Sequence, residues 1–330
     1  MSSPKVVLAT LGGTISMAPP APGHGAVPTT TAEQMLAAAP ELAALADLSV
    51  ETLLMKPGAS LTLDDALGAL RWAERAVEHG AAGVVLVQGT DTLEETAYLL
   101  DLLWPHENPL VLTGAMRTPS QLSPDGPANL AAAIRTAGAD TARGLGAVVV
   151  LDQQIHAARR VRKRDSIHLS AFCSGAFGPL GRLHEHHVTI GNRIARPAAL
   201  ARPDRPSSFV PLLQATLGDT GELLRLLIED GHTDGVVVAG FGAGHVSATF
   251  AEAVTAASFP VVLCSRTGDG PVLEATYGFP GSERDLVGRG AIPAGWLGPL
   301  KARILLLVLL GAGNGTDAVR NALALHGSMP

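Results

Sequence analysis

The chain has 330 residues, 47% of them hydrophobic and 16% charged, with a formal net charge of −6. This length is sufficient for two domains, and this composition excludes a largely disordered chain. The negative charge provides no overall attraction to nucleic acid or to an anionic membrane, so we expect neither as a partner.

Short apolar runs alternate with helical patterns through the first half of the chain. The expected strands are 5–9, 49–54, 83–87, 110–112 and 146–151, and the expected helices are 32–38, 63–78, 93–103 and 127–136. This alternation predicts a parallel sheet with helices on both faces. Thr62 is the expected N-cap of the second helix, and Thr92 that of the third. Glu95, three residues after Thr92, completes the pattern of a capping box.

A proline-rich stretch divides the chain. Four prolines without hydrophobic periodicity fall within 196–211, which we interpret as a linker. A second α/β block follows, with expected strands 235–239 and 260–263 and helices 220–229, 247–257, 299–310 and 316–325. The predicted fold is therefore α/β, with a larger three-layer N-terminal domain at 1–195 and a smaller C-terminal domain at 212–330.

Cysteines and terminal segments predict a cytoplasmic protein. MSSPKVVLATLGGT lacks the apolar core of a signal peptide, and the apolar run at 304–312 is too short to span a bilayer. Cys173 and Cys264 are the only cysteines and have no metal-binding spacing, which favours a reducing compartment. The HEHH segment at 184–187 favours an exposed hairpin over a metal site, and we expect no metal.

Polar residues follow each of the first four expected strands. The exits read LGGTIS, PGAS, GTD and TGAMR, so each combines glycine with a hydroxyl or a charge. Ligands of open α/β sheets bind outside the carboxyl ends of the strands. Each exit taken singly is explained by turn and cap chemistry. The recurrence of hydroxyls at every exit favours a polar pocket ringed by backbone N–H groups.

Threonine and lysine chemistry gives this pocket a possible reaction. A threonine hydroxyl is a weak nucleophile and must lose its proton to a nearby base. A lysine buried beside other cations can accept a proton, and Lys163 in RRVRKRDS is a candidate that Asp91 could hold. From the residues alone, 159–164 is more often a solvated basic edge, so both readings stay open.

Four longer motifs carry a family resemblance. LATLGGTIS, VQGTDTLEETAYLLDLL, PLVLTGAMRTPSQLSPDGPANLAAAI and FGPLG resemble signatures of the bacterial-type L-asparaginase (asparaginase/glutaminase) family, and the likeness extends from residue 5 to about residue 325. The resemblance implies an asparaginase-like fold. It also implies an amidohydrolase that converts L-asparagine and water to L-aspartate and ammonia without a cofactor, with glutaminase as a minor activity.

The resemblance also implies roles for individual residues. Thr14 would be the acylated nucleophile, and Thr90, Asp91 and Lys163 would form a second catalytic group, leaving Thr92 to cap the helix. The implied substrate-binding positions are Gly13, Gly58, Ala59, Ser60, Gly89, Ala115, His245 and Glu274. The last two would reach the site of a neighbouring subunit, so the implied assembly is a homo-oligomer, a dimer or tetramer, with sites at the interface.

The chain departs from the family pattern in places. The family often has a tyrosine in the lid after the first threonine, but 16–33 contains none. The lid at 17–31 therefore needs another group, or a water, to activate Thr14. Leu11 replaces the usual threonine, and His245 replaces an asparagine. A non-catalytic asparagine or aspartate sensor is the alternative function. A subunit that acts on misacylated tRNA is less favoured, because no RNA-binding domain or basic face is visible.

Overall fold

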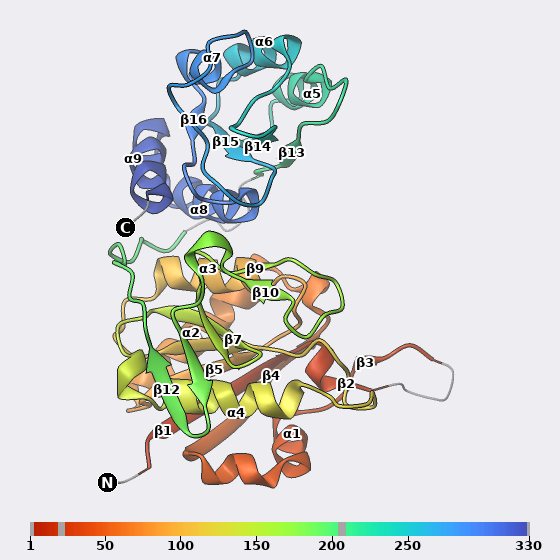
Figure 1. Cartoon of the computed structure of the whole chain (residues 1–330), viewed down its shortest axis with the longest axis vertical. Coiled ribbons are helices and arrows are strands. Elements are labelled where there is room, and N and C mark those ends of the chain that lie inside the picture. The colour runs from red at the N-terminus through yellow and green to blue at the C-terminus, as the bar shows by residue number, and fades with distance from the viewer. Residues whose placement is uncertain (1–2, 19–23, 204–208, 329–330) are drawn as a thin grey trace. The chain divides into compact units, whose positions relative to one another are not determined.

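The chain folds into two compact units, Met1–Ala199 and Leu200–Pro330, each built around its own sheet (Figure 1). The computed structural model describes residues 3–18, 24–203 and 209–328. The predicted fold class is confirmed, because the larger N-terminal unit has a mostly parallel sheet and the smaller C-terminal unit a wholly parallel one.

The N-terminal sheet has eight strands in the order β12-β11-β8-β7-β6-β5-β1-β4. Its parallel part comprises β4 (Asp47–Lys56), β1 (Lys5–Gly12), β5 (Gly83–Val87), β6 (Leu110–Thr113) and β7 (Ala147–Leu151). Its antiparallel part comprises β8 (Gln154–Ala157), β11 (Gly181–His184) and β12 (His187–Ile190). The parallel strands are those expected from sequence, whereas β8 was not foreseen. The HEHH segment forms the expected hairpin, turning at Glu185, whose φ is 53°.

Helices cover both faces of this sheet (Figure 1). One face carries α1 (Ala32–Ala38) and α4 (Gly126–Ala137), and the other carries α2 (Leu63–Glu78) and α3 (Leu93–Leu103). The first three predicted helices match the observed ranges, and α4 is one residue longer at each end than predicted. Alternate side chains of β5 face opposite layers, and Val85 and Val87 pack into the same core as Leu130 and Ile134 of α4.

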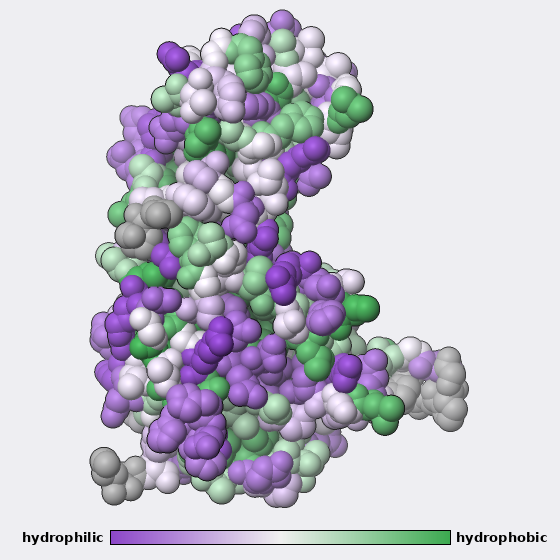
Figure 2. Space-filling model, viewed as in Figure 1, coloured by the Kyte–Doolittle hydropathy of each residue, from purple (hydrophilic) through white to green (hydrophobic). Residues whose placement is uncertain are grey.

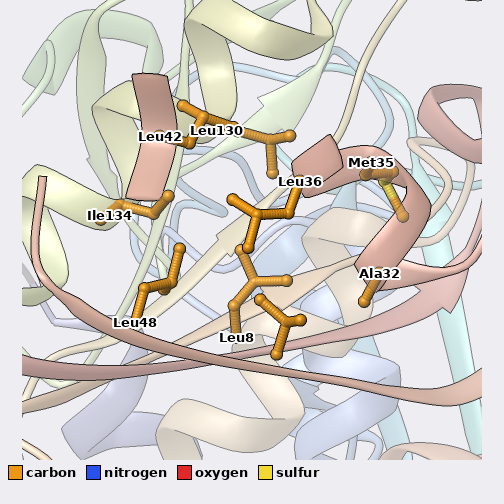
Figure 3. A pocket seen from close by; sticks show the side chains of 9 residues that line it. Leu8, Ala32, Met35, Leu36, Leu42, Leu48, Leu130 and Ile134 are labelled. Carbon is orange, nitrogen blue, oxygen red and sulfur yellow. The ribbon is translucent and has the colours of Figure 1, made fainter. Parts of the chain in front are cut away.

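The core on the α1 and α4 face contains a small pocket (Figure 3). Its lining is Leu8, Ala32, Met35, Leu36, Leu42, Leu48, Val50, Leu130 and Ile134. Because all of these side chains are apolar, the pocket offers no partner for a polar amide or carboxylate. It is a packing feature of the core and lies apart from the polar strand exits.

The C-terminal unit has a four-stranded parallel sheet with helices on both faces. Its strands are β13 (Leu212–Gln214), β14 (Val236–Gly240), β15 (Val261–Ser265) and β16 (Ile292–Pro293), in that order. Its helices are α5 (Glu222–Asp230), α6 (Ala248–Ala256), α7 (Glu283–Gly288), α8 (Pro299–Gly311) and α9 (Thr316–Gly327). The short elements β13, β16 and α7 were not predicted. Among the described residues, no helix is long and apolar enough to cross a membrane.

Short elements complete the structure. They are η1 (Thr14–Ser16), η2 (Pro40–Ala44), η3 (Gly58–Ser60), η4 (Asp140–Ala142), η5 (Gly175–Phe177), the ribbon of β2 (Met17–Ala18) with β3 (Val27–Pro28), and the ribbon of β9 (Arg162–Lys163) with β10 (Phe172–Cys173). The first ribbon belongs to the predicted lid at 17–31, of which 19–23 lie outside the described residues.

The stretch expected to be a linker has no regular secondary structure in its described part, and 204–208 lie outside the described residues. Its first residue is nevertheless fixed to the N-terminal unit. Arg196 donates from Nε to Oδ1 of Asp101 at 3.2 Å and from Nη2 to the carbonyl of Trp104 at 3.0 Å. On the face shown in Figure 2, hydrophobic and hydrophilic residues are interspersed over both units.

Candidate active site

Three of the predicted strand exits meet through glycines. A Cβ on Gly13 would overlap the backbone of Gly89, and a Cβ on Gly58 would lie 2.9 Å from the carbonyl oxygen of Gly89. Such distances are too short for a side chain at any of the three positions. The glycines at the ends of β1, β4 and β5 therefore allow the three backbones to touch, and this contact brings the polar groups of the exits to one edge of the sheet.

Thr14 is set by the irregular end of β1. The register of β1 with β4 shifts between Thr10 and Gly12, and Gly12 and Gly13 have φ angles of 106° and 91°. The N–H of Gly13 donates to the carbonyl of Lys56 at 3.1 Å. This left-handed turn begins η1 at Thr14, which is half-buried. Within the described residues, the Thr14 side chain has no hydrogen-bond partner, so its hydroxyl is available for a ligand.

Thr90, Asp91 and Lys163 form a hydrogen-bonded group. The Nζ of Lys163 lies 2.9 Å from Oγ1 of Thr90 and 3.3 Å from Oδ1 of Asp91. Thr90 is only 5% exposed, whereas the side chains of Lys163 and Asp91 are 20% and 59% exposed. The amine thus lies between a buried hydroxyl and an accessible carboxylate, which is a geometry that can transfer a proton.

Lys163 reaches this group from a distant part of the chain. It lies on β9, where it pairs with Phe172 of β10. Its backbone N–H donates to Oε2 of Glu94 at 3.2 Å, and Glu94 is buried in the first turn of α3. The helix that follows Thr90 and Asp91 therefore also fixes the backbone of their lysine partner. Sequence reasoning missed this role of Glu94, because an acid in the first turn of a helix is already accounted for by the helix dipole.

A buried histidine contacts the residue that follows the same ribbon. Nδ1 of His156, on β8, lies 2.9 Å from Oγ of Ser174, the residue after β10. Burial lowers the pKa of His156 to about 4, because the cationic ring would lose its hydration. The ring is therefore neutral at ordinary pH and forms a neutral hydrogen bond with the serine.

The predicted capping box at Thr92 is wrong. Among the described residues, the Thr92 side chain forms no cap bond, and its φ and ψ angles are −117° and 12°. Its hydroxyl instead donates to the carbonyl of Gly58 at 2.9 Å. The prediction for Thr62 is confirmed, since Thr62 and Asp65 form a reciprocal capping box at the start of α2. The local pattern was similar at both helices, but the Thr92 backbone lacks the extended conformation of a cap, and its hydroxyl donates to a distant carbonyl.

The loop after β6 is held by a carboxylate that sequence reasoning missed. The N–H groups of Met116 and Arg117 each donate to Asp125 at 2.9 Å, and Asn129 donates from Nδ2 to the carbonyl of Gly114 at 3.0 Å. These bonds fix the backbone around Ala115, which is buried. Asp125 lies two residues before the predicted helix 127–136, but its side chain bonds the loop, and no cap bond from it is found among the described residues.

The two remaining predicted residues lie in the C-terminal unit. His245 donates from Nε2 to Oε2 of Glu283 at 3.1 Å, and its ring contacts Tyr277 and Phe279 edge-on. Glu283 is fully buried and accepts from the N–H groups of Thr276 and Tyr277. Burial opposes ionisation of Glu283, but these N–H donors and His245 outweigh it and hold its pKa below the ordinary value. Glu274 is exposed.

The described residues offer no metal centre. No group of three or more histidine, cysteine, aspartate or glutamate side chains gathers within 3–18, 24–203 and 209–328 in a way that could hold a metal ion. His184 and His187 face each other across the β11–β12 hairpin with ring centroids 5.7 Å apart, and His186 contacts Arg135.

Comparison with known proteins identifies the family. The profile of the asparaginase N-terminal domain matches residues 5–196. The profile of the glutaminase/asparaginase C-terminal domain matches residues 209–323. The chain belongs to the asparaginase family. The resemblance noted from the sequence motifs is thereby confirmed, and with it the asparaginase-like fold.

Individual members of the family match along nearly the whole chain. A probable L-asparaginase from Deinococcus radiodurans is 35% identical over 327 residues, with 97% of each chain covered. An L-asparaginase from Bacillus licheniformis is 31% identical over 319 residues, covering 93% of this chain and 96% of the relative. The crystal structure of a probable cytoplasmic L-asparaginase from Campylobacter jejuni superposes with a TM-score of 0.86 at 28% identity, covering 97% of this chain and 99% of that one.

The asparaginase fold accounts for which predicted site residues meet. Those on the N-terminal unit, around Thr14, Thr90 and Lys163, gather at the strand exits. His245 and Glu274 belong to the other unit. Leu11, which replaces the usual threonine, is buried in the core. The roles that the family resemblance implies for these residues stay predictions.

Proposed function

We propose that this protein hydrolyses L-asparagine to L-aspartate and ammonia, with glutaminase as a minor activity. The observation that carries the proposal is the contact of Lys163 Nζ with Thr90 at 2.9 Å and with Asp91 at 3.3 Å, beside the exit that bears Thr14. Two threonine hydroxyls, an amine and a carboxylate can supply the nucleophile and the proton transfers of an acyl-transfer reaction. Relatives named L-asparaginase, similar over nearly their full length, support asparagine as the substrate.

Thr14 is the proposed nucleophile. Its Oγ attacks the carbonyl carbon of the substrate's side-chain amide, the hydroxyl proton of Thr14 is transferred to the amide nitrogen, the C–N bond breaks, and ammonia leaves. Water then attacks the resulting ester, which releases aspartate and restores the Thr14 hydroxyl. In this scheme Lys163, in its neutral form, accepts the proton of Thr90 directly or through water, and Asp91 fixes the position of the amine.

Backbone groups at the strand exits would bind the rest of the substrate. The turn of Gly58, Ala59 and Ser60 is proposed to hold the α-carboxylate and α-amino groups, and Ala115 to lie beside the scissile amide. Gly13 and Gly89, whose backbones touch, are proposed to contribute backbone groups to the site. Glutamine differs from asparagine by one methylene, which is worth about 1–3 kcal/mol of discrimination in a pocket, so a minor glutaminase activity fits this site.

The functional unit is proposed to be a homo-oligomer, a dimer or tetramer, in which His245 and Glu274 reach the site of a neighbouring subunit. The contacts of His245 with Glu283, Tyr277 and Phe279 fix the orientation of its ring, which supports a functional role for this side chain. Light scattering at assay concentration tests the assembly, and a fully active monomer would contradict it. A cytoplasmic location is also proposed, supported by two unpaired cysteines and by the cytoplasmic relative from Campylobacter jejuni.

Steady-state ammonia release tests the function. We expect turnover of L-asparagine, weaker turnover of L-glutamine, and little with the D-forms of either. Thr14→Ala serves as the matched control for spontaneous or contaminating ammonia. Tight binding of asparagine or aspartate without ammonia release would instead support the sensor, and the proposal would fail.

A further inference from the structure

The geometry points to Gln88 and Thr92 as positioning residues that hold the Gly58–Ser60 turn in its substrate-binding place. This inference rests on the proposed function, in which that turn binds the α-carboxylate. In sequence, Gln88 and Thr92 lie on either side of the Thr90–Asp91 pair, and the Thr92 side chain forms no cap bond with α3 among the described residues. The Nε2 of Gln88 lies 3.3 Å from Oγ1 of Thr92, whose hydroxyl lies 2.9 Å from the Gly58 carbonyl.

The hydrogen bonds from Gln88 to Thr92 and from Thr92 to the Gly58 carbonyl form a relay. The carbonyl at its end fixes the direction of both bonds. The Gly58 carbonyl can only accept a hydrogen bond, so the Thr92 proton points to it. Thr92 then has only its lone pairs to offer to Gln88, and the Gln88 amide must donate. Each bond thereby polarises the next, which strengthens a chain of this kind in a low-dielectric setting.

The orientation of the Gln88 amide follows from its surroundings. Gln88 is completely buried, and its Nε2 also approaches the Gly89 carbonyl at 3.4 Å and Oγ1 of Thr96 at 3.1 Å. Its Oε1 is buried without a hydrogen-bond partner among the described residues. Rotating the amide would set Oε1 against the Gly89 carbonyl, where two acceptors repel. Leaving the buried Oε1 of Gln88 without a hydrogen-bond partner among the described residues is costly. In this orientation the contacts of Nε2 with Gly89, Thr92 and Thr96 offset that cost.

The Gly58–Ser60 turn lies in close contact with Gly89, which precedes Thr90 and Asp91, so it needs a link that holds it in this place. Its internal backbone bonds are those of Ser60 to Pro57 at 2.9 Å and of Leu61 to Gly58 at 3.3 Å. A Cβ on Gly89 would lie 2.7 Å from the Gly58 nitrogen, so the two backbones touch. Ala59 and Ser60 are exposed. The Thr92 hydroxyl is therefore a direct link between the turn and the exit of β5, 34 residues away along the chain.

Thr92→Val is the decisive substitution, because valine keeps the shape and removes both relay bonds. No cap bond is lost, since the Thr92 side chain forms none among the described residues. Thr136→Val is the matched control: its buried hydroxyl donates to the Ala132 carbonyl at 2.8 Å in the last turn of α4. The next residue, Ala137, contacts Gly83 at the start of β5. Thr136 therefore lies toward the amino ends of the strands, away from the exits that bear the site. Thr92→Ser restores a hydroxyl, and Thr92→Ala is the smaller variant should valine prevent folding.

Two measurements decide the inference. Backbone hydrogen exchange of the peptide containing residues 57–61 should accelerate in Thr92→Val and not in Thr136→Val. The KM for asparagine and the Kd for aspartate should rise about tenfold in Thr92→Val, with kcat changed far less, and Thr92→Ser should recover most of the loss. A purely structural role for Thr92 would lower the melting temperature of Thr92→Val without this split between KM and kcat.

Other results overturn the inference. Unchanged exchange at residues 57–61 in Thr92→Val would show that the relay does not hold the turn. Faster exchange with unchanged aspartate affinity would show that the turn is held but not for the substrate. Failure of the proposed function looks different, because the wild-type protein would then release no ammonia from asparagine, while the exchange measurement would still decide whether the relay holds the turn.

Discussion

Replacing Lys163 by methionine tests the proposed base directly. The methionine keeps most of the volume of the stem but removes the amine from Thr90, 2.9 Å away, and from Asp91, 3.3 Å away. The backbone bond from residue 163 to Glu94 and the pairing with Phe172 do not depend on the side chain. The fold and the Kd for aspartate should therefore persist. General-base assistance is worth about a hundred- to ten-thousand-fold, so kcat should fall by that order, or roughly 3–5 kcal/mol of barrier.

Steady-state ammonia release and aspartate titration are the assays, and Lys163→Arg and Arg164→Met are the companion variants. Arginine keeps the charge but does not deprotonate near neutral pH, so Lys163→Arg should lose kcat to a similar extent. Arg164 is the exposed neighbour in sequence, and Arg164→Met should be close to wild type. If Lys163→Arg retained full activity, Lys163 would be an electrostatic anchor for Asp91 and Thr90 and would not act as a base.

Three further outcomes are expected. Thr14→Ala and Thr90→Val should each lose most turnover with unchanged circular dichroism, and near-wild-type kcat in either would remove that residue from the mechanism. Burial opposes ionisation of Asp65, but Lys56 at 2.8 Å and the Thr62 N–H hold its pKa below the ordinary value. Asp65→Asn should thus cost about 1 kcal/mol of unfolding free energy near pH 7, and this difference should vanish as the pH falls through the lowered pKa; a difference independent of pH would refute this account. His156, with a pKa lowered to about 4 from an ordinary 6.5, takes up its proton more readily when unfolded. The unfolding free energy should fall by about 3 kcal/mol between pH 6.5 and pH 4 from this residue, and His156→Asn should flatten that slope in urea titrations; an equal slope in both proteins would contradict it.

Strands and helices with strong local signals were predictable from sequence. The ranges of α1, α2 and α3 match because amphipathic periodicity and polar starts coincide there. The strand β8 was missed because its four residues, QIHA, place a histidine at a fully buried position where an apolar residue would be expected. The two residues of β16 and the turn at Asp152 and Gln153, which reverses the chain after β7, are likewise too short to give periodicity. Only the neighbouring strands define such elements.

The contact of Lys163 with Thr90 and Asp91 was anticipated from the sequence, but the side chains that support it were not. Lys163 lies 73 positions from Thr90, so no local pattern distinguishes a base from a solvated cation there. The family motif settled which reading to favour. The supports of the site, Glu94 and Asp125, carry charges that local reasoning assigns to helix starts, because an acid in a first turn is stabilised by the helix dipole in any case. Their tertiary partners are backbone N–H groups, which leave no mark in the sequence.

The two threonines at the starts of α2 and α3 show where local reasoning ends. Both precede a helix and both have an acid three residues later, yet Thr62 has the extended backbone of a cap, with ψ of 167°, and Thr92 has ψ of 12°. Thr62 is exposed, so its hydroxyl has the orphan N–H groups of its own helix to satisfy. Thr92 adjoins a turn whose carbonyl comes within 2.9 Å, because glycines at 58 and 89 allow the two exits to touch. At α3 the Thr92 backbone, with ψ of 12°, is not the extended one of a cap, and its hydroxyl donates to the tertiary carbonyl of Gly58 without accepting from its own helix among the described residues. The surplus of hydroxyls and acids in GTDTLEE is thus used on distant partners, and the conformation of the site depends on contacts that form only when the sheet assembles.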